Sequence, residues 1–148
     1  MTTASEAYAE VRARIEANTP TRLAGQLRWQ YDNNGSLPDI PAPFLYTELD
    51  PDRAYLAGFG GGAGANLWRN PARINCFVFV PSREGFASAS DIAEELAVLF
   101  RGYRSDNLQC FAATVFPLGA GVAPGLQTEQ GNYDCAIAEI EIHFDLIG

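Results

Sequence analysis

The sequence predicts an α+β fold, a single domain over residues 1–148 in which two helices pack on a mostly antiparallel or mixed β-sheet. Three observations lead to this prediction. Only residues 5–18 and 88–101 show the period of an amphipathic helix. Several short apolar stretches, separated by Gly, Pro and Asn, are typical of strands. Strands and helices do not alternate regularly, as they do in a parallel α/β fold.

The first predicted helix, residues 5–18, places Tyr8, Val11 and Ile15 on one apolar stripe. Pro20 follows, and proline cannot continue a helix because it lacks the backbone N–H and clashes with the preceding turn. The sequence therefore predicts a single amphipathic helix at the start of the chain, packed through one face.

The second helix is predicted to start at residues 88–91, Ser-Ala-Ser-Asp, which match a capping box. Ile92, Leu96 and Phe100 then lie on one apolar face. Gly102 follows at the end, where a residue without a side chain suits the left-handed conformation that stops a helix.

The remaining apolar stretches predict strands at residues 27–32, 44–49, 53–58, 66–68, 74–80 and 108–116. Residues 74–80 are apolar on both faces, so we expect a central strand that is covered on each side. Residues 117–130 are rich in Gly and Pro and predict a loop before the last strand.

The last predicted strand alternates almost without error. Its apolar side chains on one face are Ala136, Ala138, Ile140, Ile142, Phe144 and Leu146, and its polar ones on the other are Glu139, Glu141, His143 and Asp145. Because side chains of a strand point alternately to its two faces, we expect one face to be buried. The other, acidic face is expected to meet solvent or a partner.

The charges are unevenly distributed along the chain. The formal net charge is -8, every basic residue is an arginine, and six acids but no arginine follow Arg104. Tight binding to nucleic acid relies on Lys and Arg, so an acidic half disfavours it. The same half is compatible with a surface that DNA only passes, because repulsion prevents adhesion.

Length, composition and cysteine usage exclude several protein classes. A chain of 148 residues with 47% hydrophobic residues can bury a core, and no apolar run approaches the roughly 20 residues of a membrane span. The N-terminus has no signal-peptide pattern, so we expect a cytosolic protein without a membrane partner. Cys76, Cys110 and Cys135 show no Cys-x-x-Cys spacing, which favours buried thiols over disulfides or zinc ligands.

Three features of the sequence are candidate chemical sites. Residues 58–63 match a G-x-G-x-x-A pattern, but no room is left for the helix that a dinucleotide site needs before the next strand, so a hairpin tip is expected instead. His143 is the only histidine and could act as a general base beside Glu141 or Asp145, or simply be a solvated or interface residue.

Glu139 and Glu141 lie on one strand face about 6.6 Å apart, which suits paired carboxylates or a hard cation as well as a plain acidic ladder. No Ser/His/Asp order, metal spacing or P-loop is present in the sequence. We therefore expect no catalytic residue, no cofactor and no metal.

The order of these elements resembles a known family. Residues 11–18 look like the opening helix of small tail terminator proteins of long-tailed phages and gene-transfer particles. The strand at residues 74–81, the Ser-Arg-Glu-Gly turn at 82–85 and a helix ending in Leu-Phe-Arg-Gly at 99–102 continue the match. A Phe-containing strand, a Gly-rich loop and an alternating strand ending near Phe144 complete it.

This resemblance implies a structural protein of the virion that is made in the host cytoplasm. Proteins of this family form a ring, of six identical subunits in related examples, on the head-proximal end of the tail tube. The ring stops tube growth and joins the tail to head-completion proteins of the neck, while DNA passes through without specific binding. Nothing catalytic is implied.

Several residues are candidates for roles in such a ring. Subunit contacts could use Arg69, Arg73 and Arg83 against the acidic half of a neighbour. Glycine-rich loops, which cost entropy to order, are expected to become fixed at contacts with adjacent tail or neck proteins through Gly60, Gly62, Gly121 and Gly125. Acids predicted to face the bore are Glu139, Glu141 and Asp145.

Two alternatives remain open at the level of sequence. The acidic strand face could pack under a neighbouring subunit instead of lining a bore. The protein could also be another neck or head-completion component, or a small-ligand-binding protein or hydrolase that uses Glu139 and Glu141.

Overall fold

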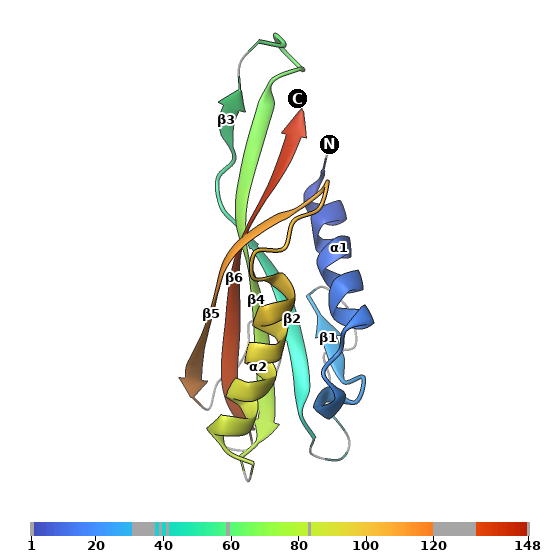
Figure 1. Cartoon of the computed structure of the whole chain (residues 1–148), viewed down its shortest axis with the longest axis vertical. Helices are drawn as coiled ribbons and strands as arrows, with labels where there is room; N and C mark the ends of the chain where they lie inside the picture. The colour runs from blue at the N-terminus through green and yellow to red at the C-terminus, as the bar shows by residue number, and fades with distance from the viewer. Residues whose placement is uncertain are drawn as a thin grey trace.

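The computed structural model describes residues 2–30, 38, 40, 42–58, 60–82, 84–119 and 133–147. Within these residues, both α-helices lie on the same face of one six-stranded mixed sheet (Figure 1). The predicted α+β fold, with two helices packed on a mostly antiparallel or mixed sheet, is confirmed.

The sheet has the strand order β1-β2-β4-β6-β5, and β3 pairs with one end of β4. The bounds are Leu27–Trp29 for β1, Phe44–Pro51 for β2, Tyr55–Gly58 for β3, Leu67–Pro81 for β4, Gln109–Gly119 for β5 and Tyr133–Ile147 for β6. Only the pairing of β1 with β2 is parallel among these strands. Strand β4 lies inside the sheet, as the apolar run at 74–80 predicted.

The two strands expected at residues 66–68 and 74–80 are one strand, which corrects the prediction. Strand β4 runs for 15 residues through Pro71. Proline is tolerated there because β2 ends and β3 begins beside it, so its missing N–H faces the connection between those strands. The Pro71 carbonyl, which points to the same side, accepts a hydrogen bond from the Asp52 backbone N–H at 3.0 Å.

Helix α1 spans Ala4–Ala17, close to its predicted bounds, and starts at a capping box formed by Thr3 and Glu6. Helix α2 spans Phe86–Phe100 and begins directly after Gly85, whose φ is 80°. The capping box predicted at residues 88–91 is therefore wrong, because the helix starts earlier. The Ser88 hydroxyl instead accepts a hydrogen bond from Arg22 at 3.0 Å. Gly102 has φ 72°, as its predicted role at the helix end requires.

The main core lies between the sheet and the two helices. It includes Val11 and Ile15 of α1, Leu96 and Phe100 of α2, and Ile74 of β4. Helix α1 is tied to the sheet by Tyr8, whose hydroxyl donates to the Thr47 carbonyl and accepts from the Gln30 N–H. We call the face of the sheet that the two helices cover the helix face.

The opposite side, named the far face, has two halves. The aromatic half is a second buried cluster, formed by Phe44, Tyr46, Phe77, Phe79, Tyr133, Cys135 and Ile137. The charged half consists of Glu48, Asp50, Arg69, Arg73, Asn75, Glu139, Glu141, His143 and Asp145. The alternation predicted for the last strand is confirmed, and its even-numbered residues from 136 to 144 are buried on the helix face.

All three cysteines are free and buried, as expected from their positions in strands. Burial raises the pKa of each thiol to about 12, so Cys76, Cys110 and Cys135 stay protonated and unreactive at neutral pH. Neither α1 nor α2, nor any other helix in the described ranges, is long and apolar enough to cross a membrane.

Candidate functional site

The charged half of the far face gathers polar residues that are distant in sequence. Strands β2, β4 and β6 place them in rows because facing residues on paired strands lie side by side. Going away from the aromatic half, these rows are Glu48–Asn75–Glu139, then Asp50–Arg73–Glu141, then Pro71–His143, then Arg69–Asp145.

The row farthest from the aromatic half holds a bidentate ion pair. Arg69 donates from Nε to Asp145 Oδ1 and from its terminal nitrogen to Oδ2, both at 2.9 Å. The guanidinium holds the pKa of Asp145 below its ordinary value, and the carboxylate raises the pKa of Arg69. About one third of each side chain remains exposed. Arg69, expected to face the acids of a neighbour, thus meets an acid of its own chain.

Arg73 is also engaged within the chain, at 3.3 Å from Asp50. Its cross-strand neighbour on the other side is Glu141, which is exposed, whereas Glu139 in the preceding row is partly buried. The structure therefore brings Glu139, Glu141 and Asp145 together on one face, as predicted, and adds two arginines among them. Asp145 has its charge balanced, and Glu141 is the most exposed of the three.

His143 lies between these rows, and its ring packs edge-on against Phe111 with 4.6 Å between ring centres. Burial lowers the pKa of His143, as does the nearby Arg69, while Asp145 and Glu141 act in the opposite direction. The lowered pKa favours the neutral form of the imidazole. Its Nδ1 is buried and has no hydrogen-bond partner among the described residues.

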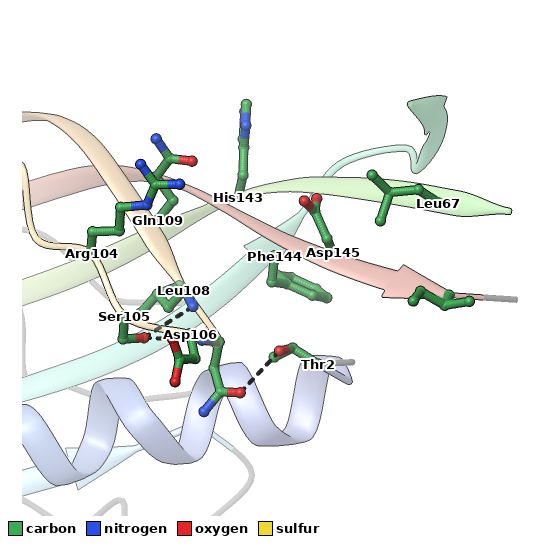
Figure 2. A pocket seen from close by; sticks show the side chains of 12 residues that line it. Thr2, Leu67, Arg104, Ser105, Asp106, Leu108, Gln109, His143, Phe144 and Asp145 are labelled. Carbon is green, nitrogen blue, oxygen red and sulfur yellow. Dashed lines mark hydrogen bonds between the residues drawn. The ribbon is translucent and has the colours of Figure 1, made fainter. Parts of the chain in front are cut away.

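Two small hollows flank His143. One, of about 200 Å³, is lined by Thr2, Ser105 and Asp145 among others, and Figure 2 shows that His143 and Asp145 project from the same side of β6. The other, of about 290 Å³, is lined by Arg73 and Glu141 together with His143. Both are smaller than the 300–1,000 Å³ or so typical of small-molecule sites.

The hydroxyl groups of the first hollow are occupied by structural hydrogen bonds. Ser105 Oγ accepts from the backbone N–H groups of Asn107 and Leu108, and Thr2 Oγ1 donates to Asn107 Oδ1 at 3.2 Å (Figure 2). In the described part of the chain, no hydrogen bond joins His143 to a hydroxyl or thiol. His143 therefore has no activated nucleophile beside it within these residues.

Metal-binding side chains do not converge in the usual way. Among the described residues, no group of three or more His, Cys, Asp or Glu side chains is placed to hold a metal ion. Glu139 and Glu141 lie two residues apart on one strand, but the nearest acids on β2 stand across the intervening strand β4. Among the described residues, no further carboxylate, histidine or cysteine therefore joins Glu139 and Glu141 to complete a metal site.

Sequence reasoning missed Glu48 and Asn75. Asn75 Nδ2 donates to Glu48 Oε1 at 3.2 Å, and burial raises the pKa of Glu48, an effect that this hydrogen bond partly offsets. The alternation Phe44, Tyr46, Glu48 in β2 is a signal that places Glu48 on the same face as the aromatic residues. Its position beside Asn75 depends on strand register, which no local pattern indicates.

The glycines predicted at contacts fall into two groups. Gly60 and Gly62 lie between β3 and β4, at φ 130° and 76°, so both adopt conformations that side chains disfavour. A Cβ added to the intervening Gly61 would overlap the Ala65 carbonyl. Arg83, Gly121 and Gly125 lie outside the described residues.

No protein-family model matches the chain, and no curated protein sequence matches it at a significant level. A role for this chain is therefore inferred from its own residues, from the order of its elements and from the layout of the far face.

Proposed function

We propose that this chain is a structural subunit of a phage tail, a tail terminator that assembles with copies of itself into a ring of six. The ring would end the tail tube, contacting the tube protein on one side and a head-completion protein of the neck on the other. In this proposal the protein belongs to the virion and has no catalytic role.

The observation that carries the proposal is the layout of the sheet. Both helices cover the helix face, while the far face leaves Glu141 exposed beside Arg73 and the Arg69–Asp145 pair. A polar surface of this kind, whose two hollows beside His143 are below the usual size of ligand pockets, suits contact with other subunits. The element order on which the resemblance rests is also the order found in the fold.

The charged half also suits a surface past which DNA slides. Duplex DNA carries about one negative charge per 1.7 Å, so a surface of free arginines would hold it. Arg69 and Arg73 are each paired with a carboxylate, while Glu141 is exposed. We therefore propose that this half of the far face, including Glu139 and Asp145, is oriented toward the bore.

Assembly is tested by the mass of the purified protein in solution. A ring of six has a mass of about 96 kDa, six times the 16.0 kDa of the chain, and light scattering with negative-stain images measures both mass and shape. Rings with a central hole are expected. A two-fold dimer, or a monomer that also fails to bind tail tubes, contradicts the proposal.

The orientation of the charged half is tested by reversing the exposed charge with Glu141→Lys. Rings are expected to form, and they should retain DNA that the wild-type ring releases. Glu95→Lys, on the exposed side of α2, is the matched control with the same charge change. Failure of Glu141→Lys to assemble, when Glu95→Lys assembles normally, places Glu141 in a subunit contact instead. Replacing Glu139 as well extends the test to the neighbouring row.

The hairpin tip is tested by deleting residues 60–64. The deletion removes a turn closed by the Ala65 N–H to Gly62 carbonyl hydrogen bond and leaves the core strands intact. We expect folded protein whose tails are not completed. Normal tail maturation after the deletion contradicts a role of Gly60 and Gly62 in contacts.

A further inference from the structure

Strand β3 and the adjoining ends of β4 and β6 extend past both helices (Figure 1). We call this part of the sheet the arm and define it as β3, residues 67–68 of β4 and residues 146–147 of β6, which are paired side by side. Neither buried cluster of the described residues includes a residue of the arm. The arm is therefore a sheet extension that the core of its own chain does not cover.

One side of the arm continues the helix face and is apolar. Even-numbered residues of β4 and β6 lie on this face, and Leu56 pairs with Trp68, which in turn pairs with Leu146. The three side chains therefore form one row. Trp68 is 37% exposed, and Leu56 and Leu146 are each partly exposed. Exposed tryptophan next to aliphatic side chains is typical of the anchor residues of protein interfaces.

The other side of the arm, which continues the far face, is apolar as well. Leu67 pairs with Ile147 on this side, and Tyr55 stands beside Arg69 in the row where the charged half begins. Ile147 is 54% exposed and Tyr55 is 48% exposed. Contiguous apolar surface of this kind marks a contact site on a soluble protein. The single chain thus leaves two apolar sides of one arm exposed, and a partner on one side would cover only half of them.

The distribution of charge indicates what can approach the arm. Copies of this chain repel one another, because the formal net charge is -8. The arm and its tip are neutral, since residues 54–68 and 146–147 contain no Asp, Glu, Arg or Lys. Two copies can therefore meet through their arms without bringing like charges together, and the apolar area that they bury favours the contact.

We propose that the arm forms the contact between neighbouring copies of this chain, with the Trp68 side of one arm packed on the Ile147 side of the next. This inference rests on the ring of the proposed function and identifies the surface that closes it. The contact joins two different surfaces, so it is heterologous and can repeat from copy to copy until a ring closes.

The two apolar sides of the arm favour this arrangement over a dimer. A two-fold contact joins the same surface of both copies, so it would leave the other side of each arm exposed. Repeated around a ring, a single kind of contact covers both sides of every arm. The contact ends where the Arg69–Asp145 pair begins, which leaves the charged half of the far face free to face the bore.

The test uses the full chain and places a charge on one side of the arm at a time, with Trp68→Glu or Ile147→Glu. A carboxylate buried in an apolar contact is costly because it loses its water. Every contact in a ring contains one copy of each side, so either variant alone should break all of them. Light scattering should then give the 16.0 kDa of a single chain instead of the mass of a ring.

Mixing the two variants distinguishes a heterologous contact from other contacts. The unchanged Trp68 side of one variant can meet the unchanged Ile147 side of the other, while both remaining sides carry a glutamate. The mixture should therefore form a heterodimer of about 32 kDa, twice the 16.0 kDa of the chain, and nothing larger. It is measured at high protein concentration, because a single contact lacks the added strength of a closed ring.

Val98→Glu is the matched control, because it adds the same charge at an apolar position of α2 that is 64% exposed and lies outside the arm. It should form rings like the wild type. Circular dichroism checks that each variant is folded, and Leu56→Glu acts on the same side of the arm if Trp68→Glu is not folded.

The outcomes separate this inference from the proposed function. Rings formed by both folded arm variants overturn the arm contact and leave the ring itself standing. The same holds if those rings have lost only their binding to tail tubes, which would place the tube protein on the arm. Loss of assembly in one variant alone, or a mixture that stays monomeric, also overturns the heterologous contact. A wild-type protein that is a monomer overturns both proposals.

Discussion

The two halves of the far face are built by the same three strands, yet they differ in almost every property. In the aromatic half, Phe44 stacks on Phe79 with 4.8 Å between ring centres, and Tyr133 meets Phe44 edge-on. In the charged half, the side chains are joined by ion pairs that stay partly exposed. One half therefore contributes stability through burial, and the other leaves its side chains available for binding.

The largest expected effect is in the aromatic half. Phe79→Ala removes a fully buried ring from the stack with Phe44, so we expect a loss of about 3–5 kcal/mol in the free energy of unfolding. Urea denaturation followed by circular dichroism measures the loss. A loss below about 1 kcal/mol would mean that this half is not a packed cluster, and the contrast between the halves would disappear.

A smaller effect is expected from the ion pair between Arg69 and Asp145. Because both side chains are about one-third exposed, a double-mutant cycle with Arg69→Ala and Asp145→Ala should give a coupling of about 0.5–1 kcal/mol. Arg69 lowers the pKa of Asp145, so this stability is present above the ordinary value of 3.8 and is lost as the pH falls through the lowered pKa. Coupling that does not decrease in acid would show that another interaction joins the two residues.

Glu48 should show the opposite pH dependence, although it lies on the same face. Burial raises its pKa, and Asn75 and Asp50 are the polar groups that act on it. Its contribution is therefore fully present below the ordinary value of 4.5 and is lost as the pH rises through the raised pKa. Glu48→Gln should be more stable than the wild type at pH 7, by less than about 1 kcal/mol, and equal to it in acid.

Thermal unfolding of both proteins across this pH range measures the difference. A Glu48→Gln variant that is less stable than the wild type at pH 7 would contradict the raised pKa of Glu48. Such a result would mean that the Glu48 carboxylate is stabilised by a positive group.

The smallest effect is expected at Glu141, the exposed acid of the charged half. Glu141→Ala should change the free energy of unfolding by no more than about 0.5 kcal/mol, because an exposed side chain loses little when truncated. The same urea titration as for Phe79→Ala permits direct comparison. A loss above about 1 kcal/mol would show that the charged half, too, is held together by its side chains.

Much of the fold was predictable from local patterns. The apolar stripe through Val11 and Ile15 predicted α1, and Gly102 marked the end of α2. Strict alternation placed Glu139 and Glu141 on the face opposite Ile140. These features follow from the geometry of a single helix or strand, which a sequence records directly.

The start of α2 and the continuity of β4 were predicted wrongly, each for a physical reason. Gly85 has a positive φ, and α2 begins directly after it, before the Ser-Ala-Ser-Asp pattern. The Ser88 hydroxyl then accepts a hydrogen bond from Arg22 instead of capping the helix. Proline usually interrupts a strand, but the side of Pro71 that lacks an N–H faces the connection between β2 and β3, where no strand needs that hydrogen bond. In both cases the local pattern was not enough, because Arg22 contacts Ser88 and the ends of β2 and β3 lie beside Pro71.

The sequence by itself determined which residues form each element and which face of each strand is apolar, because side-chain periodicity is a property of one segment. Only the tertiary structure decided which residues become neighbours. Arg69 meets Asp145 across 76 positions of the chain, and Asn75 comes to lie between Glu48 and Glu139. These contacts depend on the register between strands, and a shift of one residue would exchange every partner and turn each acid to the other face.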